Sequence, residues 1–353
     1  MARTAGEARG AQALMAGAGL ALACVFAALV LLLTAAETVA QPAATASSKA
    51  AETQRLRLLA GVKSWGYQLR QLKFDELAAS PFDLLVIDHA LSVMRRFQHE
   101  FDRERLGPVK IKPDGSRRLL LAYLSIGEAE RYRFYWREDW EKSPPAWLAE
   151  ENKEWPGNYN VRFWDPEWQR IIFGTPESYL ERMIRAGFDG VYIDRADVSL
   201  EWQKSRPTAE AEMVKLLTSL AAHARRIDPH FLIIMQNAEE LLASAEVMSA
   251  IDGLAKEDLF YGIDHKASPN DKETVDWTIE ALAPLRRSGR RILLVEYLDD
   301  PAKIADVIAR ARLHDYVVHF TVRDLGVLST TPPSAPRAAA PGAPALPPPT
   351  RVP

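Results

Sequence analysis

Acidic residues stand directly after short apolar runs at several places in this chain of 353 residues. The clearest example is the segment Gly187–Asp194, with the sequence GFDGVYID. Gly187 suits a left-handed helix end, and residues 191–193 are strand formers. Such a run is typical of a parallel strand that delivers a carboxylate to the mouth of an α/β barrel. We therefore predict a chemical role for Asp194, the alternative being that it caps the following helix.

The same arrangement recurs at other apolar runs of the chain. The parallel strands of a barrel point their C-terminal ends to one face, where active sites form. Besides Asp194, the acids and amides at these predicted ends are Asp88, Glu128, Asn237, Glu239, Glu257 and Glu296. Some of them should be helix caps or partners of Arg195 and Lys256. The remainder predict an acidic pocket.

An acidic pocket suits two chemistries. Oxygen ligands bind divalent cations, whereas a pair of carboxylates hydrolyses glycosidic bonds when one is protonated and the other ionised. Metal binding is disfavoured because His89 and His265 lie near predicted strand ends without a paired ligand at suitable spacing. We therefore predict no metal and no cofactor, and we favour a carboxylate pair.

Aromatic residues near the same strand ends favour a sugar as the ligand. Aromatic faces stack on pyranose rings and bury much area with few rotatable bonds. Tyr123 and Tyr192 lie within predicted strands and are the aromatic residues most expected in the core. We predict that the sugar contacts come from Tyr67, Tyr132, Trp164, Tyr261 and Tyr297.

Composition excludes several other classes of protein. The net charge is −3 and no basic patch is interleaved with aromatic residues, so we expect no nucleic-acid partner. The single cysteine, Cys24, lies in the N-terminal apolar segment and leaves the rest of the chain without disulfides or a thiol nucleophile. Neither a Gly-x-Ser-x-Gly elbow nor a phosphate-binding glycine loop is present.

Both ends of the chain differ in composition from its centre. Arg3 and Arg9 precede an uncharged apolar stretch, and small residues at 38–40 offer a cleavage site. Residues 1–40 therefore predict a signal peptide or, as the alternative, a retained signal anchor that attaches the protein to a membrane. We expect a secreted or periplasmic protein, or one anchored and facing outward. Residues 41–60 read as a linker, 61–329 as the folded domain, and 330–353 as a disordered tail rich in Pro and Ala.

Between residues 61 and 329, strand-like runs alternate with amphipathic helical segments. The expected strands are Val62–Gln68, Leu84–Asp88, Leu119–Gly127, Gly190–Asp194, Leu232–Asn237, Gly253–Glu257, Ile292–Tyr297 and Tyr316–Thr321. The clearest helices are Pro176–Ala186, Glu210–Ile227, Glu239–Val247, Asp276–Ser288 and Pro301–Leu313. This alternation predicts a (β/α)8 TIM barrel of the α/β class. An open doubly wound sheet is the alternative, but the first strand lacks the glycine-rich dinucleotide loop.

One apolar run falls outside this alternation. Val161–Trp164 has the character of a further strand, but the residues before it are dense in Trp, Pro and Asn. We expect it within a long insertion that follows the third strand.

Six segments in a fixed order also resemble a known family. They are Ser64–Leu69 (SWGYQL), Ala122–Glu130 (AYLSIGEAE), Phe188–Asp194 (FDGVYID), Asn237–Leu241 (NAEEL), Asp252–Gly262 (DGLAKEDLFYG) and Val295–Asp299 (VEYLD). Together they resemble the extracellular glycoside hydrolases related to glycoside hydrolase family 114, the endo-α-1,4-polygalactosaminidases. The resemblance covers most of residues 62–328 and implies a TIM barrel with its catalytic pair at Asp194 and Glu257.

The resemblance also implies a function. It suggests an exported hydrolase of a galactosamine-containing or other amino-sugar polymer, with Asp194 as nucleophile or base, Glu257 as proton donor, and exchange of these roles left open. A catalytically silent carbohydrate-binding or envelope scaffold is the alternative. The chain departs from the family pattern at Ala238, where glycine is expected, and at Glu296, where aspartate is common.

Overall fold

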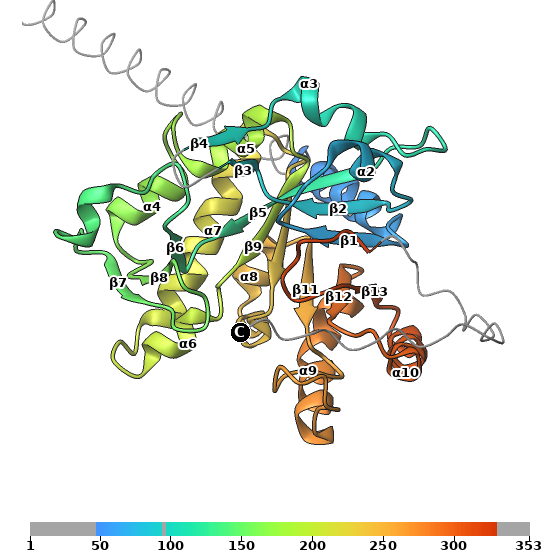
Figure 1. Cartoon of the computed structure of the whole chain (residues 1–353). Coiled ribbons are helices and arrows are strands. Elements are labelled where there is room, and N and C mark those ends of the chain that lie inside the picture. Colours follow the sequence, from blue (N-terminus) through green and yellow to red (C-terminus); the bar gives the residue numbers. More distant parts are fainter. Residues whose placement is uncertain (1–46, 94–96, 330–353) are drawn as a thin grey trace, which may run out of the picture. The chain divides into compact units, whose positions relative to one another are not determined.

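The computed structural model describes residues 47–93 and 97–329. Residues 47–53 belong to one compact unit and residues 54–329 to a second, larger one. In the larger unit eight strands form one parallel sheet in the order β1-β2-β5-β9-β10-β11-β12-β13 (Figure 1). Their bounds are β1 Trp65–Gln68, β2 Leu84–Ile87, β5 Leu119–Ser125, β9 Gly190–Asp194, β10 Leu232–Gln236, β11 Gly253–Glu257, β12 Arg291–Glu296 and β13 Val317–Phe320.

This sheet is nearly closed into a barrel, which confirms the predicted TIM-barrel fold. Strands β1 and β13 are its two ends. The indole Nε1 of Trp65 on β1 donates to the carbonyl oxygens of Val317 (3.0 Å) and Leu294 (3.2 Å). The backbone just after β1 also bonds to the C-terminal segment, where the amide of Leu69 donates to the carbonyl of Leu325 (3.0 Å).

Alternation along the strands sorts their side chains into two apolar clusters. The cluster inside the barrel contains every second residue, such as Leu121, Tyr192 and Val295, around Trp65. The other cluster lies between the sheet and the helices. A strand residue therefore faces the barrel interior or the helix layer according to its parity, and this decides where each strand end presents its last side chain.

Helices follow most of the strands and cover the sheet (Figure 1). Their bounds are α2 Phe74–Ala79, α3 Arg103–Leu106, α4 Pro166–Ile172, α5 Tyr179–Ala186, α6 Val198–Gln203, α7 Ala209–Ile227, α8 Ala245–Ala250, α9 Lys272–Arg287 and α10 Pro301–Leu313. Short 3-10 helices are η1 Pro108–Lys110, η2 Glu138–Glu141 and η3 Glu239–Ala243. The prediction of a single helix over Glu239–Val247 is wrong, because η3 ends at Ala243 and the Ser244 side chain caps a separate helix, α8.

Two glycines explain the strand that carries Asp194. Gly187 ends α5 in the left-handed region with φ 95°, as the sequence predicts. Gly190 begins β9, and a Cβ there would lie 2.4 Å from the carbonyl oxygen of Leu232 on β10. Only glycine therefore allows this close approach of neighbouring strands.

Smaller strands form two additions to the barrel. The antiparallel pair of β3 (Ala90–Val93) and β4 (Phe97–Glu100) follows β2. Neither strand was predicted from the sequence. After β5, β6 (Glu128–Glu130), β7 (Leu148–Glu151) and β8 (Asn158–Val161) form an antiparallel sheet in the order β6-β8-β7. This sheet is the expected long insertion, and its last strand ends at Val161, where the expected run begins.

The terminal predictions are only partly covered by the described residues. Residues 1–40, expected to form a signal peptide or anchor, and the expected tail at 330–353 lie outside them. The linker expected at 41–60 is wrong from residue 47 onward, because residues 47–60 are helical. Across residues 47–93 and 97–329, no helix combines the length and the apolar character needed to cross a membrane.

Candidate active site

Asp194 and Glu257 end two strands of the barrel and share the parity of its interior. On β9, Tyr192 belongs to the inner cluster, so Asp194 two residues later points to the same side. On β11, Ala255 is an inner residue and Glu257 follows it by two. One strand, β10, separates β9 from β11. The two carboxylates therefore stand at the same end of the barrel on nearby strands.

Glu257 is held by neutral donors from two neighbouring strands. The Tyr297 hydroxyl, just after β12, contacts Oε1, and the Gln236 side-chain amide, at the end of β10, donates to Oε2. Asn237 donates to Oε2 (3.3 Å) through Nδ2 and accepts from the Glu257 backbone amide through Oδ1 (3.1 Å). The phenol of Tyr67 on β1 reaches Gln236 (3.4 Å). These bonds fix the orientation of the Glu257 carboxylate.

Asp194 also has neutral donors. The Tyr123 hydroxyl on β5 donates to its Oδ2 (2.6 Å), and the backbone amide of Arg195 donates to its Oδ1 (2.8 Å). Within the part of the chain that the structure describes, neither Asp194 nor Glu257 is in an ion pair. Lacking a paired cation, both carboxylates are more easily protonated than a carboxylate in an ion pair.

Burial and mutual repulsion shift both groups in the same direction. Burial, and then the nearby charge of Glu257, raise the pKa of Asp194 to about 7, although the Tyr123 hydrogen bond opposes this. Burial likewise raises the pKa of Glu257 against the hydrogen bond from Tyr297. Because the charge of one group acts on the other, the two carboxylates titrate as a pair.

The backbone that carries Asn237 is unusual. Asn237 and Ala238 both have left-handed φ angles, 51° and 54°. The Asn237 amide donates to the carbonyl of Ala255 (2.8 Å), which ties this turn to β11. The turn brings the Asn237 side chain against Glu257. It also explains why a glycine is expected at position 238, since a side chain there is strained.

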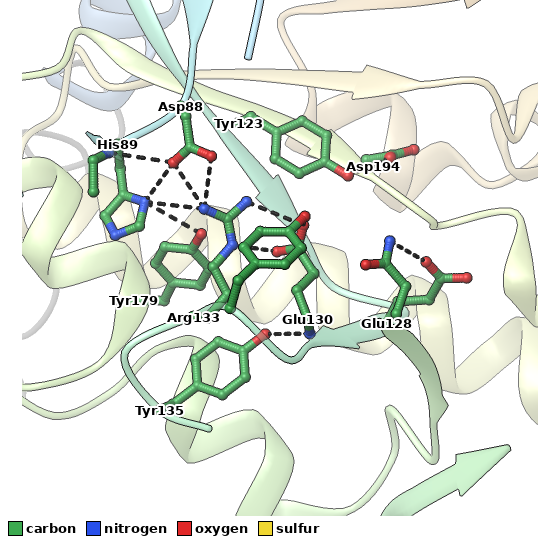
Figure 2. Close-up of polar contacts among 12 residues, drawn as sticks. Asp88, His89, Tyr123, Glu128, Glu130, Arg133, Tyr135, Tyr179 and Asp194 are labelled. Carbon is green, nitrogen blue, oxygen red and sulfur yellow. Dashed lines mark hydrogen bonds and ion pairs between the residues drawn. The ribbon is translucent and has the colours of Figure 1, made fainter. Parts of the chain in front are cut away.

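Asp88 lies in a different environment from the one expected. Both of its oxygens accept from Arg133 Nη1 (2.7 and 2.8 Å), and His89 Nδ1 lies 2.9 Å from Oδ1 (Figure 2). Burial alone would raise the pKa of Asp88, but the Arg133 charge and the His89 contact outweigh it and lower that pKa to about 2. Asp88 is therefore held as a buried ion pair and is not free to bind sugar.

Arg133 is the centre of this cluster, which we call the Arg133 cluster: Asp88, His89, Glu130, Tyr132, Arg133 and Tyr179. Arg133 also pairs with Glu130, and its guanidinium lies 4.9 Å from the Tyr132 ring centroid. The Tyr132 hydroxyl donates to Glu130 (2.5 Å). Tyr132 keeps 37% of its surface exposed, so one edge of its ring is accessible even though its hydroxyl is engaged.

Other expected pocket acids are paired with cations as well. Glu128 pairs with Arg195 (3.0 Å) and accepts from Asn152 (2.7 Å). Glu239 pairs with Lys256 (2.9 Å). These two ion pairs confirm that some of the strand-end acids are partners of Arg195 and Lys256, and they leave Asp194 and Glu257 as the carboxylates of the site without a cation partner among the described residues.

Glu296 faces away from the barrel interior. Leu293 and Val295 on β12 are inner residues, so Glu296 shares the opposite parity. Its Oε1 accepts from the amide of Phe260 (2.9 Å), and its side chain is fully buried. Burial raises the pKa of Glu296 to about 8. Its expected place in the pocket is wrong.

Two of the expected aromatic contacts also lie elsewhere. The Tyr261 hydroxyl donates to Asp306 on α10 (3.0 Å), which places the ring among the helices. Trp164 packs edge-on against Trp202 on α6, and the Arg206 guanidinium covers its ring at 4.4 Å. Neither ring contacts the Asp194 and Glu257 carboxylates. In contrast, Tyr67, Asn237 and Tyr297 lie in the surroundings of Glu257.

Two residues of the site were missed by sequence reasoning. Tyr123 was expected in the core, yet its hydroxyl bonds Asp194. Gln236 was not singled out, yet it joins Tyr67 to Glu257. Counting by twos along the strands would have found both, because Tyr123 follows the inner residue Leu121 and Gln236 follows the inner residue Ile234.

Among residues 47–93 and 97–329, no group of three or more His, Cys, Asp or Glu side chains converges as metal ligands would. A cavity of about 330 Å³ lies beside β13 and α10, and its lining includes Lys63, Arg312 and His319. None of the predicted site residues lines that cavity.

The geometry suits acid–base chemistry on a neutral bond. Two half-buried carboxylates at the same end of the barrel, coupled in charge and oriented by phenols and amides, can hold one proton between them. Glycoside hydrolysis uses such a pair, one as acid and the other as nucleophile or base. The phenols of Tyr67 and Tyr297 and the amide of Asn237 border these groups and offer contacts to sugar hydroxyls.

Comparison with known proteins finds sequence relatives and a similar fold. An uncharacterized protein of Methanocaldococcus jannaschii is 37% identical over 254 residues, which cover 70% of this chain and 69% of that protein. An uncharacterized protein of Deinococcus radiodurans is 34% identical over 276 residues, which cover 76% of this chain and 83% of that protein. The glycoside hydrolase domain of PelA from Pseudomonas aeruginosa has a similar fold, with a TM-score of 0.57 at 19% identity over 76% of this chain and 97% of that one.

The family itself is shown by a match that covers most of the chain. Glycoside-hydrolase family GH114 matches residues 43–334, a range that includes the whole barrel. The predicted resemblance is thereby confirmed. The chain belongs to glycoside hydrolase family GH114 and is by family a glycosidase.

Proposed function

We propose that this chain is an exported endo-α-1,4-polygalactosaminidase-like hydrolase that cleaves a galactosamine-containing or other amino-sugar polymer. The observation that carries the proposal is that two half-buried carboxylates, Asp194 and Glu257, are bound by neutral hydrogen-bond donors and have no cation partner in the described part of the chain. A glycosidase needs such a pair, because one group must hold a proton at the pH where the other is ionised.

We assign Asp194 as the nucleophile or base and Glu257 as the proton donor. Asp194 accepts from Tyr123 and from a backbone amide, and both bonds favour its ionised form. Burial favours the protonated form of both groups, and the division of roles follows the resemblance to the family. A substrate with an activated aryl leaving group tests this assignment, since it needs little help from an acid. Glu257→Gln should retain more activity on that substrate than on polymer, whereas Asp194→Asn should lose both activities.

An amino-sugar substrate fits the charges at the strand ends. Asp194 and Glu257 are unmatched by cations in the described part of the chain, whereas their acidic neighbours Glu128 and Glu239 are matched. The protonated amine of a deacetylated sugar therefore meets a net negative charge near the pair. A uronic-acid polymer would bring further carboxylates to the same place, where the nearest guanidinium, Arg195, is already occupied by Glu128.

The test is hydrolysis of three polymers by the purified protein. We expect release of reducing ends from partly deacetylated polygalactosamine, less from the fully acetylated polymer, and none from polygalacturonate. The preference for the deacetylated polymer should weaken as salt rises, because exposed charges are screened over about 8 Å at physiological ionic strength. Binding without cleavage would instead identify a silent carbohydrate-binding barrel, and preferential cleavage of polygalacturonate would overturn the substrate class.

Export is part of the proposal and rests on residues 1–40. The charged start, apolar stretch and small residues at 38–40 are typical of a signal sequence. Cell fractionation with N-terminal sequencing should find the protein outside the cytoplasm, with a mature end near Gln41. Recovery of the full-length chain in membranes would favour the retained anchor, and soluble cytoplasmic recovery would contradict both.

A further inference from the structure

Tyr123 lies between Asp194 and the Arg133 cluster (Figure 2). Its hydroxyl donates to Asp194 Oδ2 at 2.6 Å, and the other side of its ring lies 5.9 Å from the Arg133 guanidinium. Only 6% of Tyr123 is exposed. It is therefore a buried connection between a carboxylate of the site and a fixed group of charges.

We propose that Tyr123 is a positioning residue that orients the Asp194 carboxylate and favours its ionised form, with the Arg133 cluster holding the Tyr123 ring in place. The proposal rests on the function proposed above, because it assigns Asp194 a role that requires the ionised form. Tyr123 itself need not touch the substrate.

Orientation follows from the two donors of Asp194. The backbone amide of Arg195 binds Oδ1 at 2.8 Å, and Tyr123 binds Oδ2 at 2.6 Å. One donor on each oxygen fixes the plane of the carboxylate. The amide belongs to the residue next to Asp194, so Tyr123 is the contact that depends on the fold of another strand, β5.

The strongest influences on Asp194 oppose its ionisation, so the hydrogen bond from Tyr123 is needed to favour the ionised form. Burial acts first, followed by the negative charges of Glu257 and Asp197, with Arg195 acting in the opposite direction. The phenols of Tyr67 and Tyr192 also face Asp194. Burial keeps the pKa of Tyr123 well above its usual range, so this hydroxyl stays protonated and acts as a donor. A phenol that donates to a carboxylate stabilises its charge.

The Arg133 cluster makes this arrangement rigid. Arg133 is 4% exposed and pairs with both Asp88 and Glu130. Without Arg133, the negative charge of Glu130 would act on Tyr123 with no cation beside it. The cluster thereby provides a fixed wall for the Tyr123 ring.

The test is Tyr123→Phe, which keeps the ring and removes the hydroxyl. Loss of one charge-assisted hydrogen bond should lower kcat on polymer roughly tenfold to a hundredfold, with KM changed by less than about threefold. Since the Tyr123 bond lowers the pKa of Asp194, its loss should move the acidic limb of the pH profile upward by about one pH unit or more. A merely structural role would leave that limb unmoved.

Tyr316→Phe is the matched control, because Tyr316 is similarly buried (7% exposed) but precedes β13 at the other end of its strand. It should leave the pH profile unchanged. A second readout does not depend on hydrolysis: NMR of isotope-labelled aspartate carboxyls should show a group titrating near pH 7 that is absent in Asp194→Asn and shifted upward in Tyr123→Phe. An unshifted titration would overturn the proposal. A shifted titration in a protein that cleaves no polymer would contradict the proposed function alone.

Discussion

Asp194 and Asp88 hold similar places on neighbouring parts of the barrel, but their surroundings are opposite. Each comes at the end of a parallel strand, where Asp88 is buried and Asp194 is half-buried. Asp88 is paired with Arg133, and its pKa falls to about 2 despite burial. Asp194 has neutral donors, and burial together with Glu257 raises its pKa to about 7. The partner, more than the position, therefore decides whether a strand-end carboxylate is structural or reactive.

The largest expected effect would come from removing the reactive pair. Asp194→Asn and Glu257→Gln keep the shape of the side chain and remove the ionisable group. Loss of general acid–base catalysis costs roughly 10²–10⁴-fold, and loss of a nucleophile should cost at least as much. Steady-state hydrolysis should therefore nearly disappear while the thermal midpoint changes little. Near-normal turnover by either variant would show that the residue is structural and would remove the contrast with Asp88.

Disruption of the Arg133 cluster should instead lower the free energy of unfolding. Arg133→Met leaves Asp88 and Glu130 buried without their cation, and breaking a buried pair costs about 3–5 kcal/mol. Denaturant unfolding should show this loss. Arg137→Met is the control, because Arg137 and Asp139 form an exposed ion pair (2.8 Å) that solvent and salt screen. Equal losses in the two variants would mean that burial of the cluster contributes nothing.

Glu296 provides a third kind of carboxylate, buried without a cation but also outside the site. Its folded pKa of about 8 lies above the usual value, so its contribution to stability is fully present at low pH and is lost as pH rises toward 8. Glu296→Gln cannot ionise. The variant should therefore gain on the wild type between pH 5 and pH 9, by roughly 4 kcal/mol.

Thermal unfolding across this pH range tests that prediction. Glu273→Gln, on the exposed first turn of α9, measures the effect of the same substitution at the surface. A constant difference between Glu296→Gln and the wild type at all pH values would mean that Glu296 is ionised in the folded protein throughout.

Local sequence was sufficient to predict the barrel strands and the positions of Asp194 and Glu257 at the ends of two of them. The runs that end in Asp194 and Glu257 match β9 and β11 residue for residue, because an apolar strand followed by an acid is a local pattern. Parity along β12 could also have been counted, and it would have turned Glu296 away from the pocket. These features depend only on residues close together in the chain.

Partners that are distant in sequence could not be predicted in this way. Arg133 lies 45 residues from Asp88, and only the folded insertion after β5 brings them together. The neutral partners of Asp194 and Glu257 likewise come from other strands. A list of strand-end acids therefore predicts the face of the barrel correctly but overstates its charge, because it omits the cations supplied by the loops.

The smallest expected effect comes from Ala238, which lies in the turn that presents Asn237 to Glu257. Its left-handed φ of 54° costs a non-glycine residue roughly 1–2 kcal/mol. Glycine avoids this cost, but its greater freedom in the unfolded chain lowers the stability by about 0.4–1 kcal/mol. Ala238→Gly should therefore stabilise the protein by up to about 1 kcal/mol. Ala211→Gly, at an exposed helical position of α7, should destabilise it by about 1 kcal/mol. Calorimetry of both variants should give midpoint shifts of opposite sign. If Ala238→Gly is instead destabilising, the turn that presents Asn237 to Glu257 is not strained, and the alanine there must contribute packing that outweighs its backbone conformation.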